Sequence, residues 1–169
     1  MSGVVVWFTG LPASGKSTLA ERVRQRLEPR TSCVVLESDE VRVALGADGY
    51  DPSDRDGFYR VLARLAVLLA RQGHVVLVPA TAPRRAHREL ARAEAPAFLE
   101  VHVETPLAEC EQRDVKGLYA RARAGDAPML PGVGVPYEPP EAPDVTARGG
   151  FDDRAVDAIV HAVAGTRSR

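Results

Sequence analysis

The sequence predicts an α/β fold, with a mostly parallel sheet of about five strands covered by helices on both faces and completed by a lid. Short apolar runs alternate along the chain with longer segments of helical periodicity. The apolar runs are rich in Val and Leu with little alternation, which is typical of strands buried on both faces. A glycine-rich stretch follows the first apolar run and precedes the first helical segment. These three observations together favour strands joined by crossover helices.

Each element follows from a local pattern. The expected strands are the apolar runs Val4–Thr9, Cys33–Glu37, His74–Pro79 and Phe98–Glu104. The longest helix is expected over Pro52–Arg71, where large apolar residues recur at helical spacing. The remaining helices are expected over Lys16–Leu27, Asp39–Leu45, Arg84–Ala93, Pro106–Arg113, Lys116–Ala124 and Phe151–Ala164. The last of these has Asp152 or Asp153 near its N-terminus, where an acidic side chain caps a helix well.

The chain length fits one domain, residues 1–169. The stretch Gly125–Gly150 is rich in proline and glycine and poor in large apolar residues. It is either a passive linker or a lid, and its length inside a compact domain favours a lid or binding loop. We expect the lid and substrate loop at about 113–150.

Composition excludes several classes of function. The formal net charge of −1 gives no basic field for nucleic acid or an anionic membrane. No apolar run approaches the roughly 20 residues needed to cross a bilayer, and the N-terminus shows no signal-peptide pattern. Cys33 and Cys110 lack metal-ligand spacing and are interpreted as reduced cysteines. We therefore expect a cytoplasmic protein with neither nucleic acid nor a membrane as partner.

The most informative stretch matches the phosphate-binding pattern G-x-x-x-x-G-K-[ST] between a predicted strand and a predicted helix. Glycine lets backbone N–H groups converge on phosphate oxygens, and the helix N-terminus adds its positive dipole end. Lys16 can reach the β- and γ-phosphates, and the Ser17 hydroxyl can ligate Mg²⁺. The residues expected to bind a nucleoside triphosphate are Gly10, Leu11, Pro12, Ala13, Ser14, Gly15, Lys16, Ser17 and Thr18.

Asp39 follows the second strand, at the edge of the sheet where ligands bind in such folds. It is suited to orient Mg²⁺ or to accept the proton of an attacking hydroxyl, and it is also suited to cap the next helix. Arg42 and Arg55 follow the same strand, and Arg85 and Arg88 follow the third. The forked donors of arginine suit phosphate or sulfate oxygens.

A second basic group follows the fourth strand. Arg113 and Lys116 lie at the start of the expected lid. A lid arginine can close over a transferring phosphoryl group, stabilise its charge and exclude water. The alternative is a charged junction between two helices.

Three stretches resemble the adenylylsulfate kinase family: Trp7–Thr18, Glu104–Tyr119 and Pro136–Pro140. That family phosphorylates the 3′-hydroxyl of adenosine 5′-phosphosulfate with MgATP. The resemblance implies the fold of the P-loop containing nucleoside triphosphate hydrolases, ATP and Mg²⁺ as cofactors, adenosine 5′-phosphosulfate as substrate, and a homodimer. It also implies catalytic roles for Lys16, Asp39 and Arg113, with Ser17 and Asp39 at the metal.

The resemblance extends to the acceptor side. Tyr50 corresponds to a family aromatic residue that packs on the substrate adenine, and Leu130 stands where the family has the opposing Phe. Pro83 and Arg85 match the family pattern after the third strand. The implied substrate-binding residues are Asp39, Arg42, Tyr50, Arg55, Pro83, Arg85, Lys116 and Leu130.

Departures from the family pattern fall on this acceptor side. Glu37 and Glu40 replace a family Asp and Asn after the second strand, and the lid lacks a family lysine. Two other functions therefore stay open. One is a related kinase for a different small hydroxyl compound, and the other is a nucleotide-binding regulatory module with weak catalysis.

Overall fold

The structure is a computed structural model that describes residues 1–114 and 116–168; residues 115 and 169, which fall within the predicted lid and domain, lie outside the described residues. Five strands and seven helices are described. In chain order they are β1 (Val4–Thr9), α1 (Lys16–Leu27), β2 (Cys33–Val35), α2 (Ser38–Leu45), α3 (Pro52–Arg71), β3 (Val75–Pro79), α4 (Arg85–Glu94), β4 (Phe98–Val103), α5 (Leu107–Arg113), α6 (Leu118–Arg123), β5 (Val145–Ala147) and α7 (Asp153–Arg167).

The strands form one parallel sheet in the order β2-β3-β1-β4-β5. The α/β prediction is confirmed, and the four expected strands are present: β1 has the predicted bounds, and the other three are one or two residues shorter. The position of the fifth strand was not predicted. β5 has only three residues and lies inside the stretch assigned to the lid, so the predicted lid range of 113–150 is too long at its end. It pairs with β4 from Val101 opposite Val145 to Val103 opposite Ala147.

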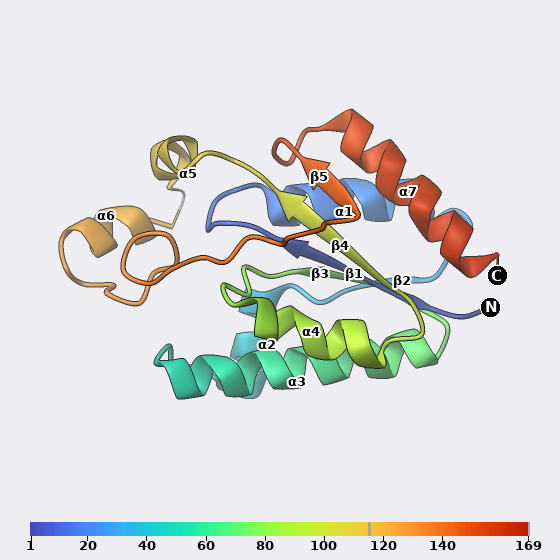
Figure 1. The fold of residues 1–169 in the computed structure, drawn as a ribbon, viewed down its shortest axis with the longest axis horizontal. Helices are drawn as coiled ribbons and strands as arrows, with labels where there is room; N and C mark the ends of the chain where they lie inside the picture. Colours follow the sequence, from blue (N-terminus) through green and yellow to red (C-terminus); the bar gives the residue numbers. More distant parts are fainter. Residues whose placement is uncertain (115, 169) are drawn as a thin grey trace.

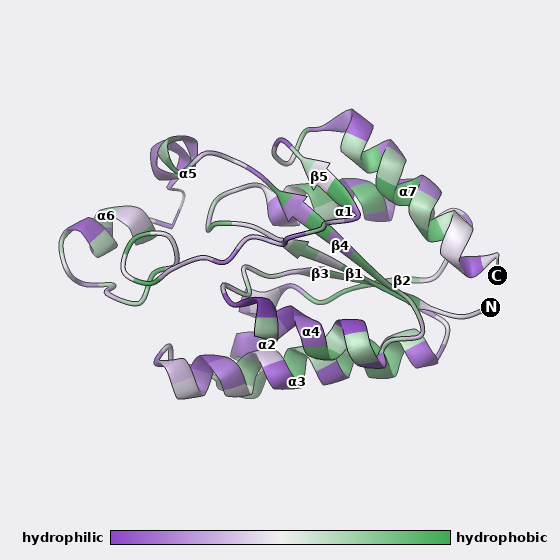
Figure 2. Cartoon of the chain, in the orientation of Figure 1, coloured by the Kyte–Doolittle hydropathy of each residue, from purple (hydrophilic) through white to green (hydrophobic). Residues whose placement is uncertain are grey.

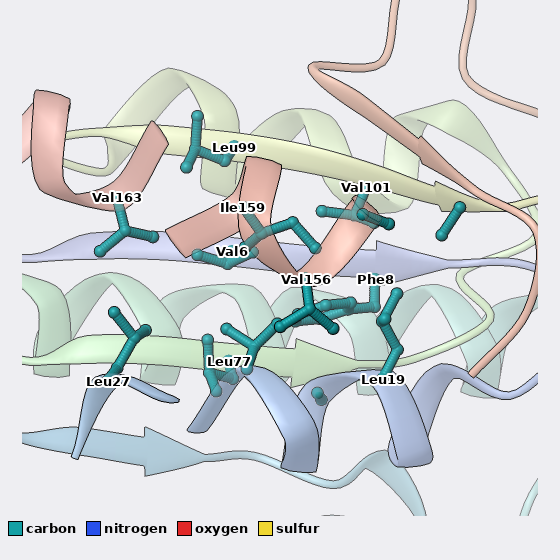
Figure 3. Packing of buried hydrophobic residues seen from close by; sticks show 14 of the residues in the cluster. Val6, Phe8, Leu19, Leu27, Leu77, Leu99, Val101, Val156, Ile159 and Val163 are labelled. Atoms are coloured by element: carbon teal, nitrogen blue, oxygen red, sulfur yellow. The ribbon is translucent and has the colours of Figure 1, made fainter. Parts of the chain in front are cut away.

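Helices cover both faces of the sheet (Figure 1), with α1 and α7 on one side and α2, α3 and α4 on the other. The alternation of side chains along β1 divides the core: Val4, Val6 and Phe8 pack under α1 and α7, whereas Val5 and Trp7 pack under α3. Figure 3 shows the first of these clusters. The helices are apolar toward the sheet and polar outside (Figure 2), as their periodicity predicts.

A third, smaller cluster lies beyond the carboxyl ends of the strands, where α5 and α6 extend away from the sheet. Its buried members are Cys110, Tyr119 and Leu130, and Leu11 and Ala13 of the glycine-rich loop pack against it. We call α5, α6 and the segment up to residue 135 the lid. Cys33 and Cys110 are both free, as expected.

The two chain ends lie close together at the amino ends of the strands, on the side of the sheet away from the lid (Figure 1). The Val4 N–H donates to the carbonyl of His74 (3.2 Å), and the Arg167 side chain donates to the carbonyl of Gly73 (2.9 Å). Both contacts are at the amino end of β3. Among the described residues, none of the helices combines the length and apolar character required to cross a bilayer.

Candidate active site

The loop Gly10–Ser17 joins β1 to α1 in a strained, tightly packed turn. Ala13 and Gly15 have φ angles of 62° and 102°, both left-handed. At Gly10 a Cβ atom would lie 2.6 Å from the carbonyl oxygen of Val103. The Ser14 hydroxyl is buried and has no hydrogen-bond partner within the part of the chain that the structure describes. Two left-handed residues and close packing that excludes a Cβ at Gly10 fit a loop whose N–H groups converge on phosphate oxygens.

Lys16 folds back across this loop. Its Nζ donates to the carbonyl oxygens of Gly10 (3.1 Å) and Leu11 (2.8 Å). Burial lowers the pKa of Lys16 to about 8, and the nearby Glu37 carboxylate opposes that shift. The ammonium therefore rests on uncharged acceptors, which phosphate oxygens would replace with a gain in electrostatic energy.

Oxygen ligands gather beside this lysine. The Ser17 hydroxyl donates to the Glu37 carboxylate at 2.6 Å, and Asp39 in the first turn of α2 forms an ion pair with Lys116 of the lid. Burial raises the pKa of Glu37, and the hydrogen bond from Ser17 partly offsets this. Within residues 1–114 and 116–168, no three His, Cys, Asp or Glu side chains are grouped to hold a metal. A cation here would therefore rest on Ser17, one or two carboxylates and substrate phosphates, as Mg²⁺ commonly does.

Two buried arginines, Arg42 of α2 and Arg55 of α3, line the same cavity as the loop. Arg42 lies between two aromatic rings, with its Cζ 4.4 Å from the ring centre of Tyr50 and 3.9 Å from that of Phe58. Its Nη1 donates to the carbonyls of Ala47 and Gly49, each at 3.2 Å. Stacking on two rings holds the guanidinium plane in one orientation.

Arg55 completes this pair. Its Nη2 donates to the carbonyl of Met129 (2.9 Å), and burial lowers its pKa. None of the ion pairs among the described residues includes Arg42 or Arg55. Two largely buried cations with only carbonyl and aromatic partners form a site for an anion.

The lid is joined to the phosphate loop by a hydrogen bond. The Tyr119 hydroxyl donates to the carbonyl of Pro12 at 2.7 Å. Asp114 accepts from the N–H groups of Tyr119 and Ala120, each at 2.9 Å, and so caps α6. Arg113 is half-exposed and lies 3.6 Å from Glu109. Both basic residues of the lid thus have carboxylate partners, Glu109 for Arg113 and Asp39 for Lys116.

These elements enclose a cavity of about 740 Å³. Most of the predicted site residues line it: Pro12, Ala13, Gly15, Lys16, Ser17, Thr18, Asp39, Arg42, Tyr50, Arg55, Arg113, Lys116 and Leu130. The cavity thus brings the phosphate loop, the acidic pair, the two arginines and the lid into one space. Gly10 and Ser14 are buried within the loop and do not line the cavity, and Leu11 lines a second hollow of about 670 Å³ together with Leu107.

Pro83 and Arg85 do not line this cavity, contrary to the expectation from sequence. The Pro83 carbonyl accepts from the N–H of Glu138 (2.7 Å), and the Arg85 side chain contacts Pro139 and Glu141. The chain leaves the cavity wall after Thr81, so both residues hold the segment after the lid instead.

Sequence reasoning missed several lining residues, namely Glu37, Tyr59, Thr81, Met129, Gly150 and Phe151. Glu37 could have been found from its place beside Asp39. Gly150 and Phe151 follow β5, and without that strand nothing in the sequence brings them to the loop. At Gly150 a Cβ would lie 2.7 Å from the Thr18 Cβ, which shows how closely the two segments pack.

Comparison with known proteins agrees with a nucleotide-binding site in this cavity. The family model described as Adenylylsulphate kinase matches residues 2–148. An adenylyl-sulfate kinase of Gloeothece citriformis is 45% identical over 163 residues, covering 94% of this chain and 93% of the relative. The bifunctional enzyme CysN/CysC of Mycobacterium tuberculosis is 47% identical over 165 residues, covering 93% of this chain. The matched part is only 27% of that longer relative.

A solved structure matches over the whole fold. The Mycobacterium tuberculosis APS kinase CysC, in complex with AMPPNP and APS, superposes with a TM-score of 0.85 at 43% identity, and the match covers 99% of each chain. The sheet order, the phosphate loop and the family match agree, and the chain belongs to the adenylylsulphate kinase family.

Proposed function

We propose that this chain transfers the γ-phosphoryl group of ATP to the 3′-hydroxyl of adenosine 5′-phosphosulfate (APS), giving 3′-phosphoadenosine 5′-phosphosulfate and ADP. The observation that carries the proposal is a single cavity with a phosphate loop on one side and the Arg42–Arg55 pair on the other. One side fits a triphosphate and the other fits a second anionic group. The relative solved with AMPPNP and APS supports both ligands.

On the donor side, the N–H groups of the loop and the N-terminus of α1 would cradle the phosphates of ATP. Lys16 would exchange its carbonyl partners for the β- and γ-phosphate oxygens, and Arg113 would close over the transferring group. Phe151, which is 82% exposed and lines the cavity, offers the donor base an apolar surface.

On the acceptor side, Arg42 and Arg55 would bind the phosphosulfate, because each presents forked donors without a competing carboxylate. Tyr50 is half-exposed and Leu130 is buried, and both line the cavity. These two side chains would contact the acceptor adenine by apolar area rather than by hydrogen bonds.

In the transfer step the acceptor oxygen attacks the γ-phosphorus, the bond to the β–γ bridging oxygen breaks, and ADP leaves. Asp39 would accept the proton of the 3′-hydroxyl once its carboxylate is released from Lys116. Ser17, with Glu37 adjacent, would hold Mg²⁺, whose charge offsets that of the phosphates. In the alternative role Asp39 would orient this Mg²⁺ instead of accepting the proton.

Three further proposals accompany this function: a homodimer, a cytoplasmic location, and a single domain over 1–169. Light scattering of the purified protein tests the first, because a homodimer has twice the mass of the 18.2 kDa chain.

The test is ADP release from MgATP with and without APS, for the wild-type protein and for Arg55→Met. We expect Arg55→Met to raise the KM for APS roughly 10- to 100-fold, which is the loss of one or two hydrogen bonds to a charged group. The KM for ATP should change little. Arg60→Met, an exposed arginine on the same helix, is the matched control.

If APS does not increase ADP release by the wild-type protein, the proposal is wrong. Sugars and other nucleotides in parallel wells then identify a different hydroxyl acceptor, and slow hydrolysis that no acceptor stimulates indicates a regulatory module instead.

A further inference from the structure

The cavity wall after β3 contains a backbone conformation that side chains disfavour. Ala82 has a φ of 42°, in the left-handed region, although it carries a Cβ atom. Such a residue persists only where its surroundings determine it from several sides. Thr81, the residue before it, lines the cavity together with Tyr59, Arg42 and Arg55. The conformation of this turn therefore sets the shape of the acceptor wall.

Side chains hold the polar backbone groups of this turn. The N–H of Ala82 donates to the Tyr59 hydroxyl (3.0 Å), and the carbonyl of Ala82 accepts from Nη1 of Arg88 (2.6 Å). The carbonyl of Thr81 accepts from the Thr9 hydroxyl at 2.6 Å. These contacts come from α3, α4 and β1, so the turn is fixed from three elements at once.

Arg88 is the centre of this network. Its side chain is 1% exposed, and its Nε donates to Glu100 of β4 at 3.0 Å. Its Nη1 also donates to the Thr9 hydroxyl (3.3 Å), and its Nη2 to the carbonyl of Glu138 (2.9 Å). One guanidinium thus joins β1, β4 and the turn after β3 to the segment after the lid.

The Thr9 hydroxyl extends the network in a defined direction. The Thr9 hydroxyl has one proton, and the Thr81 carbonyl can only accept. The Thr9 proton therefore lies in the hydrogen bond to Thr81. The Tyr137 hydroxyl, 2.9 Å away, must then donate to Thr9, as Arg88 does. No alternative set of donors satisfies all four groups, which makes the arrangement rigid.

We propose that Arg88 is a positioning residue for the acceptor: it holds the left-handed turn at Ala82 and thereby fixes Thr81 in the acceptor wall. The sequence suggested that Arg88 binds an anion directly, but its side chain is 1% exposed and does not line the cavity, and four of its five N–H donors already have protein partners. The proposal deepens the function proposed above and rests on it for the identity of the acceptor.

The competing explanation is that Arg88 only neutralises the buried Glu100. Arg92 distinguishes these two explanations. It comes from the same helix as Arg88 and donates to the other oxygen of the Glu100 carboxylate (2.8 Å). None of its contacts among the described residues involves the turn. Arg92→Lys is therefore the matched control for Arg88→Lys, since both substitutions keep the positive charge and remove the forked N–H donors of the guanidinium.

The experiment compares Arg88→Lys, Thr9→Val and Arg92→Lys with the wild type. We expect the first two to raise the KM for APS by roughly 5- to 30-fold, which is the equilibrium factor that one left-handed non-glycine residue represents. The KM for ATP should change less than twofold. In Arg88→Lys, adding Ala82→Gly should recover most of the loss, because glycine adopts this conformation without strain.

A second readout does not depend on catalysis. Hydrogen exchange of a peptide spanning residues 80–84 should speed up in Arg88→Lys and Thr9→Val, but not in Arg92→Lys. If exchange and the KM for APS respond equally to Arg92→Lys, or if Ala82→Gly recovers nothing, the positioning role is wrong. If the wild type neither binds APS nor uses it, the proposed function fails, and the exchange result alone decides whether Arg88 holds the turn.

Discussion

Lys16 is a partly buried cation whose ammonium contacts uncharged carbonyl oxygens, and the pH dependence of stability in the free protein follows from that position. Burial lowers its pKa to about 8, whereas in the unfolded chain it titrates near its usual value of 10.5. The unfolded chain therefore binds more protons than the folded protein between these two pH values. The free energy of unfolding should rise with pH across this window.

We predict that Lys16→Met is more stable than the wild type at pH 7, and that this advantage shrinks between about pH 8 and 10.5. Urea unfolding without nucleotide at pH 7 and 10 measures it. Lys116→Met is the control, because Lys116 is the only other lysine in the sequence and its side chain is 63% exposed. A constant difference across the window would contradict the prediction.

At the scale of residues, sequence predicts the position of a site residue best where a motif fixes the backbone. The loop Gly10–Ser17 could be predicted because its glycines and lysine have fixed offsets between strand and helix. Sequence could not tell whether the arginines after β3 bind a ligand or hold the fold. Arg85 and Arg88 both suit anions, but their actual partners come from β4 and from the segment after the lid, which no local pattern connects to them. Local pattern carries no information on such contacts.

At the scale of elements, the start of α7 is joined to the donor site. Asp152 accepts from the N–H of Ala155 (3.0 Å) as the helix cap, and from the N–H of Arg148 (2.9 Å) across the turn after β5. That turn contains Gly150, which packs against Thr18 of α1. A helix cap thus also holds the wall beside the phosphate loop.

We expect Asp152→Ala to lower the free energy of unfolding by about 1 kcal/mol, the usual value of such a cap. The KM for ATP should rise several-fold, and the KM for APS should stay unchanged. Asp157→Ala, which removes an exposed ion pair of the same helix, is the control.

The acid dependence of this contribution has a definite sign. Hydrogen bonds from Arg148 and Ala155 hold the pKa of Asp152 below 3.8. The stability that they provide is present above that value and is lost as the pH falls through the lower pKa of the folded protein. Unfolding curves of Asp152→Ala and the wild type should therefore converge in acid, and a gap that persists at the lowest pH would oppose this account.

Elements differ in how far sequence predicts them. The long helix α3 has the bounds expected from its apolar spacing, because five turns of periodic pattern leave little ambiguity. β5 has three residues and only one large apolar side chain, and its pairing with β4 alone makes it a strand. The donor-side residues that follow it were missed for the same reason.

At the scale of the whole molecule, the two main cores are coupled through the sheet. Neighbouring residues of β1 belong to opposite clusters, so neither core can unfold while the strand stays in place. We predict a single calorimetric unfolding transition for the chain. AMPPNP and APS together should raise its midpoint more than either ligand alone. Two separate transitions without ligand would show that the lid, or one side of the sheet, folds as a separate unit.

The position of the chain ends has a practical consequence for how this fold can be combined with others. Because Val4 and Arg167 both meet the amino edge of β3, a protein attached at either end points away from the cavity. Neither attachment would obstruct the lid or the entry of two nucleotides. The same geometry suits a unit that, in the mycobacterial bifunctional relative, corresponds to about a quarter of a longer polypeptide.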